Sequence, residues 1–252
     1  MKYILIPILI FSSLGFASCS VDLNSKSPAT TYLDRVTASD NTITQKRTIS
    51  DFEGIDISSA INVTVNEGNY NGEITIEAPD NIMDRIVTEV QNGVLVVKIK
   101  GTVSLKNEKI KVTFPHKKIR SFNISGASNV TVLPTMKVDK MAIDLSGASV
   151  LKLDVVSNLV SVDNSGASSM KISGNTQNFN IEVSGASSLT AKDLKAANVT
   201  IDCSGASSAT VWAVDNLTAD SSGASSVRYI EQNGLKTVVD TSGMSSVKSI
   251  SK

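Results

Sequence analysis

The tripeptide Ser125-Gly126-Ala127 opens a series of near-identical tripeptides that decides the fold of this chain. Ser-Gly-Ala returns at residues 146–148, 165–167, 184–186, 204–206 and 222–224, and Ser-Gly-Met closes the series at 242–244. The glycines of the series are Gly126, Gly147, Gly166, Gly185, Gly205, Gly223 and Gly243, and their spacing along the chain is nearly constant. A constant period of about 20 residues indicates a repeat architecture in which each repeat is one structural unit.

The residues around each glycine alternate between apolar and polar. Apolar side chains hold the positions four before and four after every glycine, as Phe122 and Val130 do around Gly126. This period of two is that of β-strands, and glycine suits a tight corner between two strands. One unit cannot bury its apolar side alone, whereas stacked units can. We therefore predict an all-β, right-handed, single-stranded parallel β-helix (a solenoid) of about 20 residues per coil, with its glycines in vertical register at one corner.

Two other repeat folds fit the sequence less well. A leucine-rich horseshoe needs an L-x-x-L-x-L pattern with an asparagine ladder, and neither is present. A β-propeller needs repeats of about 40 residues or more, twice the period found here.

The segment before the series carries a weaker copy of the same unit. Residues 57–65 (Ile-Ser-Ser-Ala-Ile-Asn-Val-Thr-Val) align with residues 124–132, and strand-like runs follow at 73–78, 94–99 and 110–114. We predict one β-helix domain over 48–252, with irregular coils at 48–121 and regular coils at 122–252. The alternative is a separate N-terminal β-domain.

The N-terminal residues predict where the protein is located. A basic start, an apolar run over 4–16 and small residues before Cys19 are typical of a secretory signal, and the run is too short for a permanent membrane span. Residues 16–19 (Phe-Ala-Ser-Cys) resemble the bacterial lipobox, which implies cleavage after residue 18 and lipidation of Cys19. Ordinary signal cleavage is the alternative. Ser20 is not the aspartate of an inner-membrane retention signal, so we expect an outer-membrane lipoprotein that faces the periplasm or the cell surface. Residues 19–47, polar and weakly periodic, are predicted to be a flexible tether.

The overall composition excludes several classes of partner and cofactor. The 24 basic and 24 acidic residues cancel, which argues against a nucleic-acid partner held by bulk positive charge. His116 is the single histidine, and Cys19 and Cys203 are the two cysteines, so a metal site built from several histidine or cysteine ligands is excluded. We predict no cofactor and no metal. With Cys19 lipidated, we expect Cys203 to be a small core residue.

A carboxylate stands three residues before the glycine in six consecutive units. This acidic ladder comprises Asp144, Asp163, Glu182, Asp202, Asp220 and Asp240. By strand parity it faces away from the core, and unit charges ~4.8 Å apart repel by roughly 0.9 kcal/mol in bulk water. One interpretation is a cation-binding or ligand-binding face, with Ca²⁺ favoured by oxygen ligands. The other, which we prefer for cations, is a solvated face, because Ca²⁺ needs six to eight oxygens and one column offers few.

The same carboxylates invite a comparison with glycosidases. Retaining enzymes hold two carboxyl groups about 5 to 5.5 Å apart, and Asp202 and Asp220 would be neighbours in the stack. Every unit carries the same carboxylate, however, and no insertion builds a pocket, so we predict no catalytic residue. The repeated serines do not form G-x-S-x-G. We expect those before each glycine, such as Ser125, to cap backbone groups at the corner.

The chain resembles a known family at several points. Residues 52–55 (Phe-Glu-Gly-Ile), 93–97 (Gly-Val-Leu-Val-Val), 112–115 (Val-Thr-Phe-Pro) and the Ser-Gly-Ala series are similar to the head GIN domain of auto-transporter adhesins, common in Bacteroidetes lipoproteins. The resemblance covers roughly residues 48–252. It implies a β-helix fold and a role in cell adhesion, and it supplies no catalytic residues.

Together these observations predict a lipid-anchored, non-enzymatic adhesin or binding scaffold. Its expected partners are the membrane, through Cys19, and a cell-surface glycan or protein. Two alternatives remain open: a polysaccharide-processing enzyme that uses neighbouring aspartates, and a structural envelope module that assembles end to end. The C-terminal coil shows no capping element, so its open edge could support such self-association, although Lys248 and Lys252 would oppose it.

Overall fold

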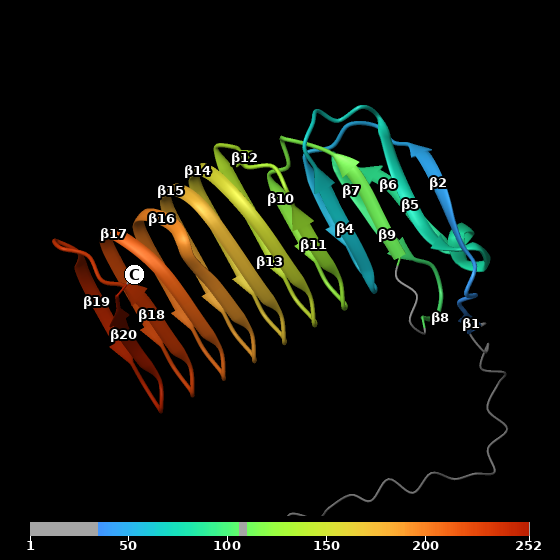
Figure 1. Cartoon of the computed structure of the whole chain (residues 1–252). Coiled ribbons are helices and arrows are strands. Elements are labelled where there is room, and N and C mark those ends of the chain that lie inside the picture. Colours follow the sequence, from blue (N-terminus) through green and yellow to red (C-terminus); the bar gives the residue numbers. More distant parts are fainter. Residues whose placement is uncertain (1–34, 106–109, 252) are drawn as a thin grey trace, which may run out of the picture. The chain divides into compact units, whose positions relative to one another are not determined.

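The fold is a parallel β-solenoid, as the glycine series predicts. The computed structural model describes residues 35–105 and 110–251. Their strands stack as a row of coils, each consisting of a strand before the corner, the corner itself and a strand after it (Figure 1). We call the sheet formed by strands before the corner the first face, and the sheet formed by strands after it the second face.

The first face contains a strand from nearly every coil, and neighbouring strands pair in one continuous order. Its strands are β6 (Ile86–Gln91), β7 (Val94–Ile99), β3 (Gly54–Ile57), β10 (Ser121–Ile124), β13 (Lys140–Leu145), the second halves of β14 (Val150–Asn164), β15 (Ser169–Val183), β16 (Ser188–Cys203) and β17 (Ser208–Ser221), and finally β19 (Lys236–Thr241). All these pairings are parallel except that of β6 with β7.

The second face has the matching order. Its strands are β2 (Thr42–Thr48), β5 (Glu73–Pro79), β9 (Ile110–Pro115), β4 (Ile61–Asn66), β11 (Asn129–Val132), the first halves of β14 to β17, β18 (Ser226–Ile230) and β20 (Ser246–Ile250). The remaining elements are β12 (Met136–Lys137), which pairs with β14, the two-stranded sheet of β1 (Val36–Thr37) and β8 (Val103–Ser104), and the 3-10 helix η1 (Asp80–Arg85).

The coils near the N-terminus do not stack in chain order. β3 pairs with β7 on one side and β10 on the other, so the coil of β3 and β4 lies between two coils that follow it in the sequence. Ser121 therefore sits beside Gly54, although several strands separate them along the chain. Strands β2, β5 and β6 run antiparallel to their neighbours and form the N-terminal end of the stack.

The tether prediction is wrong for residues 35–47, the part of the tether that the structure describes, because both β1 and β2 begin there and pair with other strands. Residues 42–48 form β2, paired along its whole length with β5. The strand is almost entirely exposed, so it carries no apolar periodicity, and its main-chain bonds to β5 hold it in place. The signal peptide at 1–18, Cys19 and the rest of the predicted tether up to residue 34 lie outside the described residues.

The corner requires glycine for two reasons. Gly205 has a φ of +73°, in the left-handed region that L side chains disfavour. A Cβ on Gly205 would also lie 2.7 Å from the carbonyl oxygen of Gly185 in the preceding coil, the oxygen that accepts the N–H of Ala206 at 2.8 Å. The same contact recurs between each later pair of corner glycines. In the coil of β3 and β4 the position belongs to Ser59, whose φ is +78°.

A ladder of buried serine hydroxyls lines the inside of the corner. These serines stand two residues after the glycine, and Ser207 is typical: its Oγ donates to the carbonyl oxygens of Ser204 at 2.6 Å and Val183 at 3.1 Å. The expectation that the serine before the glycine supplies the capping hydroxyl is therefore wrong. The serine after the glycine points into the stack, where carbonyl groups have no water to bond. Nearby, Cys203 is a fully buried free thiol, as expected.

Candidate functional site: the acidic face

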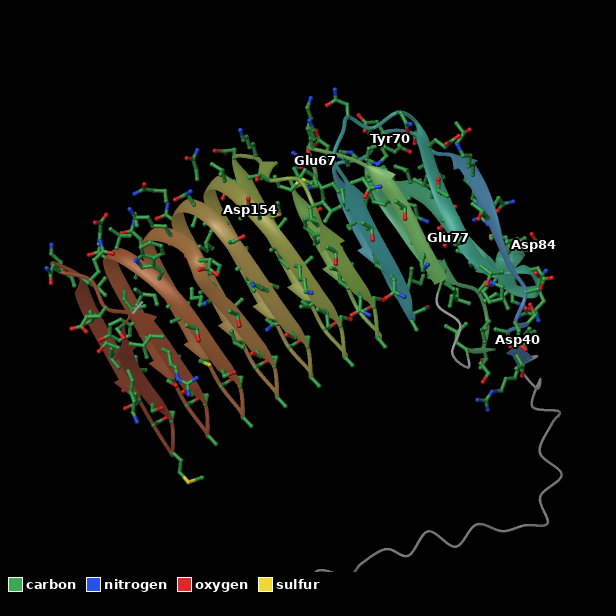
Figure 2. All side chains as sticks on the ribbon, viewed as in Figure 1. Asp40, Glu67, Tyr70, Glu77, Asp84 and Asp154 are labelled. Atoms are coloured by element: carbon green, nitrogen blue, oxygen red, sulfur yellow. The ribbon has the colours of Figure 1, made fainter. Side chains whose placement is uncertain are left out.

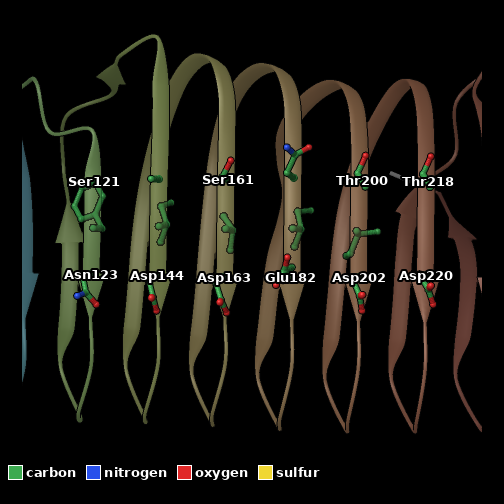
Figure 3. A pocket seen from close by; sticks show the side chains of 17 residues that line it. Ser121, Asn123, Asp144, Ser161, Asp163, Glu182, Thr200, Asp202, Thr218 and Asp220 are labelled. Atoms are coloured by element: carbon green, nitrogen blue, oxygen red, sulfur yellow. The ribbon is translucent and has the colours of Figure 1, made fainter.

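The structure places the acidic ladder in one column on the first face. Consecutive members are direct partners across neighbouring strands, from Asp144 opposite Asp163 to Asp220 opposite Asp240. All six side chains are exposed, and the five from Asp144 to Asp220 alternate with buried residues along their strands, whereas Asp240 lies in the wholly exposed strand β19. Figure 3 shows five of them as a row across successive coils.

The column extends further toward the N-terminus than the repeat predicts. β3 aligns with β10, which brings Asp56 opposite Asn123, and the Asn123 amide donates to the Asp56 carboxylate at 3.2 Å. The sequence could have placed Asp56 in this column, because it stands one residue before the segment 57–65, just as Asn123 stands one residue before the aligned segment 124–132. Asn123 thus separates the carboxylates of Asp56 and Asp144 and donates a hydrogen bond where a carboxylate would repel.

Two polar columns lie beside the ladder on the same face, both on the side away from the corner. The column five before each glycine carries Ser121, Ala142, Ser161, Asn180, Thr200 and Thr218, and together with the ladder it lines a shallow open groove of about 800 Å³. Farther out, Asn178, Asn198 and Asn216 form an amide ladder. The Asn198 amide donates to Asn178 Oδ1 at 3.0 Å, and the Asn216 amide donates to Asn198 Oδ1 at 2.7 Å. Sequence reasoning missed this amide column, although alignment on the glycines would have shown three asparagines at one position.

The ladder carries uncompensated negative charge. The ion pairs of the described residues join Lys46 to Glu73, Lys111 to Glu77 and Arg120 to Glu53, and the buried His116 ring lies 3.5 Å from Asp51, so none of these contacts includes a ladder carboxylate. Partial burial, then the negative charges of Asp163 and Asp56, raise the pKa of Asp144 above its ordinary value. Groups of like charge this close disfavour each other's ionised form.

The basic column lies on the other face. Thr131, Lys152, Lys171, Thr190, Thr210, Arg228 and Lys248 are partners in successive strands of the second face. The corner separates them from the ladder, so the solenoid presents one acidic face and one face with a basic column. Figure 2 shows the side chains on the ribbon in the same view as Figure 1.

The described residues offer no built metal site or membrane-spanning helix. Within 35–105 and 110–251, no three His, Cys, Asp or Glu side chains converge closely enough to hold a metal ion. The carboxylates form a line with one member per coil, so they supply few oxygens at any single point. No helix within these ranges is long and apolar enough to cross a membrane.

A protein whose long, regular faces are built from stacked coils belongs to the class of β-solenoid repeat proteins. Residues 51–232 match the family described as "Putative auto-transporter adhesin, head GIN domain". The chain belongs to this family, as its sequence resemblance implied.

Solved structures share the fold. A "putative adhesin" from Bacteroides fragilis has a TM-score of 0.79 at 21% identity, covering 85% of this chain and 100% of that one. A "putative adhesin" from Parabacteroides distasonis has a TM-score of 0.72 at 20% identity, covering 86% and 100%. A "Putative lipid binding protein" from the same organism has a TM-score of 0.64 at 18% identity, covering 86% and 99%. Among curated proteins none matches this sequence.

Proposed function

We propose that this protein is a lipid-anchored adhesin of the cell envelope that binds a glycan or protein ligand on its acidic face without catalysing a reaction. One observation carries the proposal. The groove between the ladder and the column five before each glycine runs from the coil of Ser121 to the coil of Asp220, and carboxylate, hydroxyl and amide groups recur along it. Such a surface suits a ligand that is itself extended, since each coil contributes one similar contact.

The chemistry of the face indicates how a ligand would bind. Carboxylates accept hydrogen bonds from sugar hydroxyls or attract basic side chains, and the serine, threonine and asparagine groups beside them both donate and accept. The ladder carboxylates occupy equivalent positions in successive coils, whereas a catalytic pair needs two carboxyl groups with different roles. The face therefore fits binding better than turnover.

The anchor completes the proposal. Cys19 would carry the lipid and place the solenoid at the outer membrane, with the ligand on the surface of a cell or matrix. A second copy of the chain is a further partner.

The binding experiment compares the two faces of the same coils. Purified chain is applied to an array of glycans and host proteins, alongside a variant with Asp163→Asn, Glu182→Gln and Asp202→Asn. The control neutralises Lys152→Gln and Lys171→Gln on the second face. We expect the acidic-face variant to lose at least tenfold in affinity for its ligand and the control to keep it. Equal binding by all three proteins would refute the choice of face.

Catalysis and anchoring have separate tests. An Asp202→Asn, Asp220→Asn variant should leave any apparent glycan degradation unchanged, and loss of a measurable turnover would establish an enzyme instead. Cys19→Ala should release the protein from the membrane fraction, and retention there would contradict the lipid anchor. Deleting residues 48–252 should abolish adhesion of whole cells while the anchor remains.

A further inference from the structure

The N-terminal end of the solenoid is closed. η1 lies between β5 and β6 in the chain and buries Ile82 and Met83 against the core. The Arg47 guanidinium on β2 donates to the carbonyl oxygen of Met83 at 3.0 Å and to Thr88 Oγ1 at 2.9 Å, which joins β2 to η1 and β6. The last core layer at this end is therefore covered by the chain itself.

The coil of β19 and β20 leaves the opposite end open. In the column four before each glycine, the residues from Phe122 to Ala219 are at most 4% exposed, whereas Val239, in the same column, is 45% exposed. Within the described residues, β19 pairs only with β17 and β20 only with β18. The outer edges of both strands thus present unpaired N–H and C=O groups, which favour pairing with another strand.

This coil also carries large apolar side chains in two columns that are small or polar elsewhere. Five residues before the glycine, where other coils carry serine, threonine, asparagine or alanine, stands Val238, which is 67% exposed. One residue after the glycine, where every earlier coil of the series has alanine, stands Met244, which is 85% exposed. In these two columns only the last coil of the series has a large apolar residue, which indicates a surface that a partner covers.

We propose that a second copy of this chain covers this end, through antiparallel pairing of β19 with its own copy. The sequence of β19 is self-complementary: pairing centred on Val238 places Lys236 opposite Asp240 of the second copy, and Asp240 opposite its Lys236. Val238 then lies directly opposite itself. These side chains share one face of the strand, so two opposite-charge pairs flank one apolar pair.

The geometry limits the assembly to a dimer. β20 carries Lys248 at the centre of its edge, which would meet its own copy with like charge, so β19 carries the contact. A contact of β19 with its own copy is tail to tail and related by a two-fold axis, and because such a contact uses the same surface on both copies it closes on itself and does not propagate into a filament.

Cross-linking of the full chain tests the contact directly. Opposed residues of an antiparallel pair have Cα atoms about 4.5 to 5.5 Å apart, within the range that a disulfide spans. Val238→Cys should therefore form a covalent dimer under mild oxidation of the purified protein. Thr218→Cys is the matched control, because Thr218 is exposed in the same column one coil earlier, away from the edge. Equal yields of dimer from both variants would overturn the proposal.

Charge exchange tests the register. In the Val238→Cys background, Lys236→Glu should lower the dimer yield at least threefold by opposing two negative charges, and Asp240→Lys should do the same with two positive ones. Combining the two substitutions should restore the original yield. Failure of the double variant to recover would refute the pairing of Lys236 with Asp240. Unchanged yields in both single variants would refute it too.

Discussion

The corner glycines offer the sharpest test of the stacked geometry, and Gly205→Ala is the informative substitution. Alanine at a φ of +73° costs about 1 kcal/mol in backbone strain. The new Cβ would lie 2.7 Å from the carbonyl oxygen of Gly185, which is backbone and cannot rotate away. Overpacking of this kind adds about 1–3 kcal/mol. We therefore expect a loss of about 2–4 kcal/mol in the free energy of unfolding.

The matched control is Gly234→Ala. Gly234 has a similar φ of +86°, but nothing lies within 4 Å of the position its Cβ would take. Only the backbone strain applies there, so the expected loss is about 1 kcal/mol. Urea unfolding gives the free energy of unfolding of both variants, and it can be followed by circular dichroism and by the fluorescence of Trp212 in β17. If Gly205→Ala costs no more than Gly234→Ala, the close approach of successive corners is refuted.

Three further predictions concern the corner, the acidic face and the N-terminal coils. Ser59→Gly should raise the free energy of unfolding by up to about 1 kcal/mol, because Ser59 occupies a left-handed φ of +78°; a lower urea midpoint would contradict this. Asp202→Asn should stabilise the protein by a few tenths to about 1 kcal/mol at low ionic strength, and the gain should vanish in about 1 M salt; a gain independent of salt would exclude charge repulsion. Burial lowers the pKa of His116 below its ordinary value although the nearby carboxylate of Asp51 raises it. His116 therefore binds a proton at a higher pH in the unfolded chain than in the folded chain. The free energy of unfolding should fall as the pH drops below about 6.5, and His116→Phe should weaken this pH dependence. An equal pH dependence in both proteins would assign it to another group.

The acidic ladder shows how much of the structure a sequence repeat can predict. In a solenoid, residues one period apart become neighbours, so aligning the sequence on its glycines lists the side chains that meet in space. Asp163 and Glu182 could be placed together in this way because each coil adds one copy of the same geometry. Asp56 could not be placed by that period, since its neighbour Asn123 stands more than three periods further along the chain and belongs to a coil stacked out of chain order.

Only the tertiary structure shows which of the corner serines donates a hydrogen bond to the backbone. Ser204 and Ser207 both flank Gly205, and strand parity alone does not say which hydroxyl turns inward at a turn. The Ser207 hydroxyl turns inward because it donates to the buried carbonyl of Val183, and only the stacking of the two successive coils brings these groups together.

The sequence by itself determined the solenoid, its period, its buried columns and its line of carboxylates, because all of these repeat with the chain and need only local alternation to be recognised. Tertiary structure alone decided the order of the first coils, the antiparallel strands beside them and the cover that η1 provides at the N-terminal end. Those features depend on individual long-range strand pairings. The free energy of the whole stack determines which strands pair, and such pairings produce no periodic pattern in the sequence.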